Sequence, residues 1–301
     1  MLTAAIHSET PLLLPSASGI EIVGATAYVI ADDAPFLYAL DAGTLALTAQ
    51  ILLFDTPDFA LGRLPKARKP DLEALTACAW PGRGQGLLLL GSGSGPLRRV
   101  GYWLPLPAGA AASVQRLDLS ALYAAAVAAL PPATQLNIEA AAASATELLL
   151  LQRGVGAGAG AAGAVLRFDL PTTLAHLAGT RNAPAPAVQF YPLPAIAGCA
   201  AGFSGAAVAP DGRLWVTASV ENTSDPVLDG PVLGSFVGVL NLATGTADFA
   251  RLAWADGPAY AGKVEGLALV GAAGADRQEL LLVTDDDLGG STALRAVVGR
   301  A

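Results

Sequence analysis

The chain has 301 residues, enough for a substantial hydrophobic core, and its formal net charge of −8 argues against nucleic acid as the main partner. Hydrophobic residues make up 53% of it, yet no stretch offers the roughly 20 uninterrupted apolar residues that a membrane-spanning helix needs. The two cysteines, Cys78 and Cys199, give neither a disulfide framework nor a zinc-binding spacing, so we expect buried free thiols. The N-terminus lacks the basic region and apolar run of a signal peptide, and we expect a cytoplasmic protein without a membrane partner.

Five short stretches recur along the chain, and each places one oxygen-bearing side chain at the start of a strand that we expect to be buried. These side chains are Glu21, Glu73, Glu139, Ser204 and Glu265. Their positions are 52, 66, 65 and 61 residues apart, and the gap counted through the two termini, 57 residues, has the same size. Repeats of about 40 to 50 residues or somewhat more, each worth one small sheet, are typical of a β-propeller. We therefore predict an all-β, five-bladed β-propeller that occupies residues 1–301 as a single domain.

The first third of the chain accounts for the ring closure and two blades. Residues 3–6 or 11–14 are expected to supply the outermost strand of the last blade, which closes the ring without a free edge. The first blade covers about residues 18–54, with strands at 28–33, 36–41 and 47–54 after the inner one. A crossing loop at 57–69 leads to the second blade, at about 70–106.

The remaining chain contains a helical insertion and three further blades. Residues 120–130 are the one clear helix candidate, because Ser120 can cap the helix, alanine favours it and Pro131 stops it. The remaining blades cover about 136–170, 202–253 and 262–299, and Asp211-Gly212 is a hairpin turn. The Gly/Ala tract at 154–163 is expected to be a flexible loop, because no helix follows it as a dinucleotide-binding loop would require.

The inner ends of the blades are expected to collect polar residues on one rim. In an antiparallel hairpin, the start of the first strand lies beside the end of the second. The residues that end the second strands therefore join the five recurring side chains. They are Asp32 and Asp33; Ser92 and Ser94; Gln152 and Arg153; Ser219 and Glu221; and Asp285, Asp286 and Asp287.

Four carboxylates that converge on one axis cannot all stay ionised and unpaired, and a hard divalent cation resolves this repulsion. Calcium takes about six to eight oxygen ligands, magnesium prefers a tighter octahedron, and no His or Cys cluster is present for zinc. We predict Ca²⁺ as the cofactor, bound by the recurring side chains Glu21, Glu73, Glu139, Ser204 and Glu265. The alternative is that the glutamates hydrogen-bond neighbouring backbone amides and hold the blades together without a metal.

Basic residues form a second constellation near the same rim. Lys69 and Lys263 lie just before two of the recurring glutamates, Arg98 follows a Gly-Ser loop that contains Ser92, and Arg153 ends a second strand. Backbone amides of such loops can cradle anions, and arginine can grip a phosphate with two donors. We therefore predict that these residues bind a small anionic ligand, for example a nucleotide. The alternative is that the basic residues are salt-bridge partners of the acidic rim.

Several of these motifs resemble the apyrase family of calcium-activated nucleotidases. They are Glu-Ala-Leu at 73–75, Ile-Glu-Ala at 138–140, Gly-Phe-Ser at 202–204 and Val-Glu-Gly at 264–266. The resemblance implies a five-bladed propeller with calcium in its central tunnel and with Glu73, Glu139, Ser204 and Glu265 among the ligands. It also implies a serine ligand in the first blade, a place that Ser18 or Glu21 could fill. The run Lys-Pro-Asp-Leu-Glu-Ala-Leu from residue 69 looks like an uncharacterised bacterial propeller family, which implies no activity.

Our leading hypothesis is a calcium-binding propeller that hydrolyses a phosphoanhydride. Asp32, Asp33 or Asp285 would act as the general base, and Arg98 or Arg153 would offset the developing negative charge. No Ser-His-Asp arrangement is visible in the sequence.

Two other classes of function compete with this hypothesis. One is a non-catalytic propeller that binds a ligand or a protein and keeps its metal for structural reasons, since a fold by itself does not determine function. The other is a sugar-acting propeller that uses paired carboxylates such as Asp33 and Asp286. Aromatic residues are only 6% of the chain, too few for a convincing sugar-stacking platform.

Overall fold

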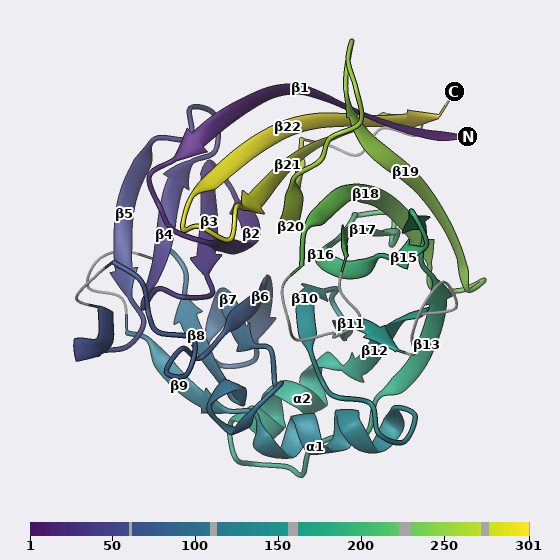
Figure 1. The fold of residues 1–301 in the computed structure, drawn as a ribbon. Helices are drawn as coiled ribbons and strands as arrows, with labels where there is room; N and C mark the ends of the chain where they lie inside the picture. Colours follow the sequence, from purple (N-terminus) through teal and green to yellow (C-terminus); the bar gives the residue numbers. More distant parts are fainter. Residues whose placement is uncertain (60–61, 109–112, 156–161, 223–229, 272–276, 301) are drawn as a thin grey trace.

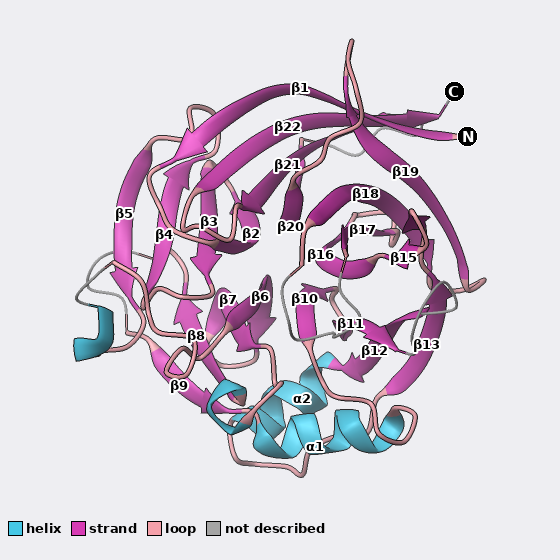
Figure 2. Cartoon of the chain, viewed as in Figure 1, coloured by secondary structure: helices cyan, strands magenta, loops and turns pink. Residues whose placement is uncertain are grey.

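The chain folds almost entirely into β-strands (Figure 2), and the computed structural model describes residues 1–59, 62–108, 113–155, 162–222, 230–271 and 277–300. Three antiparallel four-stranded sheets come in chain order. The first contains β2 (Ala17–Val23), β3 (Thr26–Ala31), β4 (Phe36–Asp41) and β5 (Leu47–Leu52). The second contains β6 (Leu72–Trp80), β7 (Gly84–Gly91), β8 (Val100–Pro105) and β9 (Gln115–Asp118). The third contains β10 (Ile138–Ala143), β11 (Glu147–Val155), β12 (Ala162–Asp169) and β13 (Ala187–Pro192).

Eight further strands form one sheet, in which the N-terminal strand joins two four-stranded halves. One half contains β16 (Gly202–Val208), β17 (Leu214–Glu221), β18 (Val232–Asn241) and β19 (Thr246–Trp254). The other half contains β20 (Lys263–Val270), β21 (Arg277–Asp285), β22 (Ser291–Arg300) and β1 (Leu2–Leu12). β1 pairs antiparallel with β22 and also, over Ala4–Ile6, parallel with β19. The N-terminal segment thus lies outermost on the last strand of the chain.

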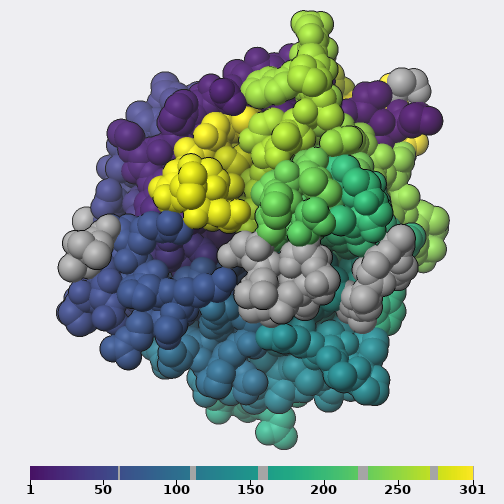
Figure 3. Space-filling model, viewed as in Figure 1, coloured from purple at the N-terminus to yellow at the C-terminus, as the bar shows by residue number. Residues whose placement is uncertain are grey.

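The sheets are arranged around a centre (Figure 1). Their first strands, β2, β6, β10, β16 and β20, each contact the next, and β20 contacts β2. Buried apolar residues gather between neighbouring sheets, for example Trp103 between the second and third sheets and Phe203 between the third sheet and β16 to β19. Figure 3 shows that segments from the whole length of the chain surround the middle of this face. A ring of small sheets about one axis is a β-propeller-like fold.

Small residues allow the first strands to come close at the centre. A Cβ atom added to Gly205 would lie 3.0 Å from the Cα of Gly266, and one added to Gly266 would lie 3.0 Å from the Cα of Gly19. Second strands such as β7 and β11 instead contain continuous apolar runs, and Leu87 to Leu90 of β7 are fully buried, as expected for a strand covered on both faces.

Two helices pack on the outside of the second and third sheets (Figure 2). α1 (Ser120–Ala129) begins at the residue where the sequence predicts it, but Leu119 is the N-cap and no side chain caps the helix. α2 (Leu170–Leu177) was not predicted, although Asp169 caps it by accepting a hydrogen bond from the Thr172 amide. None of the helices in the described part of the chain is long and apolar enough to cross a membrane.

Shorter elements and two further strands also differ from the sequence prediction. β9 and β13 lie beyond the strands expected for the second and third blades. The minor elements are the hairpin of β14 (Ala195–Ile196) with β15 (Cys199–Ala200), and the 3-10 helices η1 (Pro57–Phe59) and η2 (Pro96–Arg98). Residues 156–161 of the Gly/Ala tract lie outside the described residues. Both cysteines are free; Cys78 is buried as expected, but Cys199 is only partly buried.

Candidate functional site

Each first strand contains one β-bulge at the same place. The strand pairing of β2 with β3 passes from Ala17 to Gly19, which leaves Ser18 unpaired. The same one-residue shift occurs at the start of the other four first strands and leaves out Glu73, Glu139, Ser204 and Glu265. Bulges re-aim a side chain and are frequent beside functional sites. Four of the recurring residues of the sequence are therefore bulge residues, and Ser18 is the fifth.

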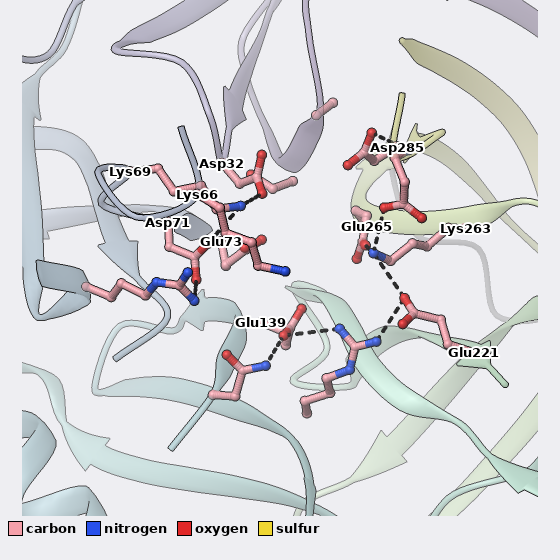
Figure 4. Close-up of a pocket in the computed structure, with 16 residues that line it drawn as sticks. Asp32, Lys66, Lys69, Asp71, Glu73, Glu139, Glu221, Lys263, Glu265 and Asp285 are labelled. Carbon is pink, nitrogen blue, oxygen red and sulfur yellow. Dashed lines mark hydrogen bonds and ion pairs between the residues drawn. The ribbon is translucent and has the colours of Figure 1, made fainter. Parts of the chain in front are cut away.

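A polar pocket of about 620 Å³ opens above the bulges (Figure 4). Ser18, Glu73, Glu139 and Glu265 line this pocket and also a smaller cavity of about 190 Å³ beside the first strands. These four side chains therefore form the layer between the two spaces. Nine of the thirteen residues predicted for the site line the pocket. They are Asp32, Asp285, Lys69, Arg98, Arg153, Lys263, Glu73, Glu139 and Glu265.

One side of the pocket is formed by the end of β3 and the chain that leads into β6. Lys69 forms ion pairs with Asp32 and Asp71, the latter at 2.9 Å. Arg98 reaches the other oxygen of Asp71 at 2.8 Å and also donates to the Ser94 hydroxyl. Asp71 has a φ of 56°, a left-handed conformation that aspartate tolerates better than most residues. Its carboxylate is thus held between two cations.

The other side is a chain of alternating charges from β10, β11, β17 and β20 (Figure 4). Arg153 bridges Glu139 at 3.3 Å and Glu221 at 2.9 Å. Lys263 in turn bridges Glu221 at 3.0 Å and Glu265 at 2.8 Å. Because every basic group here has two or more carboxylate partners, the expected anion-binding cations are neutralised within the protein.

Glu73 lies between the two sides and differs from its neighbours. The charge of Lys69 attracts its carboxylate, whereas those of Asp71, Glu139 and Asp32 repel it. Its carboxylate and those of Asp32 and Asp71 each offer an oxygen within 4.8 Å of the others, a group that could hold a metal ion. One requirement of this group is unmet, because the Oδ1 of Asp32 is buried without a hydrogen-bond partner among the described residues. Lys69 therefore satisfies this group of three carboxylates only in part.

The pocket is acidic overall, and its burial shifts the pKa values of its carboxyl groups. Eight carboxylates and five basic side chains line it, so its charge is −3 when all are ionised. Burial, reinforced by Asp71 and Glu139, raises the pKa of Glu73 well above its usual value. Burial also raises the pKa of Glu265 to about 8 and, with the help of Asp32, that of Asp285 to about 7. A further positive charge in this pocket would be favourable.

Four predicted residues lie outside the pocket. Glu21 is three residues beyond the bulge of β2, and its carboxylate accepts a hydrogen bond from the Ala77 amide of β6 at 3.1 Å. It is therefore placed between two sheets, and Ser18 occupies the position on the pocket. Ser204 is turned to the hydroxyl groups of Thr217 and Ser219, at 3.1 and 3.4 Å.

The other two predicted residues outside the pocket are Asp33 and Ser92. Asp33 forms an ion pair with Arg63 and accepts from the Ser16 hydroxyl, so Asp33 is engaged away from the pocket. Ser92 donates to Asp71 at 2.6 Å. The loop around Ser92 is not an open anion cradle either, because the amides of Ser92 and Gly93 donate to Asp71 and Arg98 carbonyls.

Sequence reasoning missed Asp71 and Asn137 of the pocket, and it placed Glu221 on the rim without giving it a role. Asp71 and Asn137 both stand two positions before a bulge residue, and Lys263 does the same before Glu265. Asn137 donates to Glu139 at 2.5 Å, and so it orients that carboxylate. A polar residue two positions before Glu73, Glu139 and Glu265 was the signal that could have identified Asp71 and Asn137.

Comparison with known proteins gives a family and a fold. The family of unknown function DUF6929 matches residues 13–298, nearly the whole chain. The chain belongs to this family. No curated protein matches the sequence.

Comparison with solved structures finds proteins of similar fold. Glutaminyl cyclase of Myxococcus xanthus matches with a TM-score of 0.53 at 10% identity, over 99% of this chain and 98% of that one. The Cps50 (Swd1) β-propeller domain of Myceliophteria thermophila gives a TM-score of 0.41 at 8% identity, over 95% and 99% of the two chains. Identities this low carry the fold alone. The family description gives no activity, and the resemblance of this DUF6929 protein to apyrases is a prediction from its motifs.

Proposed function

We propose that this DUF6929 protein is a five-bladed β-propeller that binds Ca²⁺ in the acidic pocket at its centre. The observation that carries the proposal is a group of three carboxylates, Asp32, Asp71 and Glu73, each of which offers an oxygen within 4.8 Å of the others. Leaving the buried Oδ1 of Asp32 without a hydrogen bond is costly, and a bound cation would remove that cost. Asp32, Asp71 and Glu73 would hold the ion.

The chemistry of the donors favours calcium over the transition metals. Every candidate ligand is an oxygen, since the pocket is lined by no histidine or cysteine in the described residues. Oxygens bound to one Ca²⁺ ion can be up to about 5 Å apart, which three atoms within 4.8 Å of one another satisfy. Ser18, Glu139 and Glu265 line the same pocket and could complete a large coordination shell. The eight-stranded sheet divides into two blades, β16 to β19 and β20 to β22 with β1. Together with the three four-stranded sheets, these make the proposed five blades.

Calorimetric titration of the metal-free protein with Ca²⁺ tests this proposal. We expect one bound ion in the wild type and binding weaker by at least about tenfold in Glu73→Gln, which keeps the shape but removes the charge. Glu279→Gln is the matched control, because that residue is half exposed on β21, where it pairs with Arg295. Equal Ca²⁺ affinity in the wild type and Glu73→Gln, or no binding in either, would refute the proposal.

Hydrolysis of a phosphoanhydride is a second candidate function, and Asp285 favours it. This residue lines the pocket, and burial raises its pKa to about 7, which suits a general base at neutral pH. A phosphate held by the cation would then lie in a pocket that also contains Arg153 and Lys263.

Phosphate release from nucleotides and pyrophosphate measures this activity. The hydrolase proposal predicts Ca²⁺-dependent release that falls by about 100-fold in Asp285→Asn and persists in Asp286→Asn. Calcium binding without any turnover would leave the non-catalytic, ligand-binding propeller as the function.

A further inference from the structure

Lys69 occupies the place where a cation would be held. Its ammonium group lies between Asp32 and Asp71 (Figure 4), two of the three carboxylates that could ligate a metal ion. Neither of these two carboxylates could approach an ion closely while an ammonium group stands between them, because the two cations would repel each other. Binding of a divalent cation therefore requires Lys69 to move away.

Two arginines on or near this side are anchored differently. Arg98 pairs with Asp71 but is also fixed by the Ser94 hydroxyl, and Arg63 pairs with Asp33 outside the pocket. The ion pairs of Lys69, in contrast, are with members of the carboxylate group alone. Lysine also carries a compact charge on a flexible stem, which can swing without losing a bidentate contact.

We propose that Lys69 is an internal counter-ion that Ca²⁺ displaces and that the displaced ammonium group then binds an oxyanion. The idea rests on the function proposed above and concerns its regulation. In the metal-free protein the carboxyl groups that line the pocket outnumber its basic side chains and Lys69 is neutralised, so a phosphate or phosphonate group is not attracted. Calcium lowers the negative charge and releases Lys69 into the same pocket. Oxyanion binding thus follows cation binding.

The two steps of this exchange are tested separately with Lys69→Met, which keeps the length of the side chain and removes its charge. Titration with Ca²⁺ should give an affinity about tenfold higher than that of the wild type, because the competitor is gone. Titration with methylphosphonate in saturating Ca²⁺ should show binding to the wild type and none to Lys69→Met. Arg63→Gln removes a positive charge just outside the pocket and controls for the general effect of charge.

A second variant covers the case in which Lys69→Met does not fold without calcium. Lys69→Arg keeps the charge, and its planar fork can hold both aspartates, so Ca²⁺ should bind about tenfold more weakly than to the wild type. Calcium affinity that is unchanged in both Lys69 variants, while the wild type binds Ca²⁺, would overturn the exchange and leave the proposed function intact. Absence of Ca²⁺ binding in the wild type and both variants would overturn the two together. Methylphosphonate binding that needs no calcium would overturn the order of binding.

Discussion

At the scale of single residues, the surroundings of each carboxylate decide its chemistry more than its place in the repeat. Glu73 and Glu139 are both bulge residues, yet Glu139 is held by Asn137 and Arg153, whereas Glu73 is grouped with two further carboxylates, those of Asp32 and Asp71. The pKa of Glu221 is shifted in the opposite direction to that of Glu73, which burial raises. Burial would raise its pKa, but Arg153 and Lys263 together lower it below its usual value. A metal ion is therefore expected at Glu73 rather than equally among all the glutamates.

Glu21 provides a pH-dependent prediction that is independent of the pocket. Burial raises its pKa to about 7 from 4.5, against the weaker opposing effect of the Ala77 amide. The folded protein therefore keeps a proton that the unfolded chain releases, so the stability that Glu21 contributes is lost as the pH rises from about 4.5 through 7. The loss is at most ~3 kcal/mol.

Urea unfolding of the wild type and Glu21→Gln between pH 5 and 8 measures this contribution. Glutamine cannot ionise, so the variant should gain stability relative to the wild type as the pH rises through 7. Other buried groups titrate equally in both proteins, and the difference isolates Glu21. A stability difference that stays constant over this pH range would contradict the assignment.

At the scale of elements, the first strands do two tasks that require opposite residue types. Their bulge residues carry oxygen, whereas the next residue is Gly19, Ala74, Ala140, Gly205 or Gly266. The close approach of neighbouring strands explains the small residues, because a Cβ on Gly266 would meet Val283 at 2.9 Å and Gly19 at 3.0 Å. Neighbouring strands thereby place their bulges around one small space.

Replacement of Gly266 by alanine should therefore destabilise the fold. We expect a loss of ~1–3 kcal/mol in the free energy of unfolding, because two backbones and a valine must shift to admit one methyl group. Gly95→Ala is the control, since Gly95 has extended backbone and nothing lies within 4 Å of an added Cβ. Equal denaturation midpoints for the two variants would show that the strands are not in tight contact.

The sequence predicts these elements well where local pattern determines them. β4 and the start of α1 lie where the sequence places them, because continuous apolar runs and helix formers with a proline stop are local signals. The sequence does not predict the β-bulges of the first strands, because a bulge depends on how a strand pairs with its partner strand. A one-residue shift in register exchanges the faces of a strand, and without the bulge the sequence left the place in the first blade open between Ser18 and Glu21.

At the scale of the whole molecule, the ring brings together residues that are far apart in the chain. Asp32 follows β3, Glu139 is on β10 and Asp285 is the last residue of β21. All three nevertheless line one pocket. The equal spacing of the repeats predicts this convergence, but not the ion pairs within it. Long side chains such as Lys69 and Arg153 choose their partners only once the sheets are in place.

The most direct test of the central claim is a crystal structure of the protein grown with Ca²⁺. The account predicts an ion within about 2.3–2.6 Å of oxygens from Asp32, Asp71 and Glu73, with Lys69 moved out from between the two aspartates. A structure at saturating Ca²⁺ in which Lys69 still bridges Asp32 and Asp71, and no ion lies beside Glu73, would contradict it.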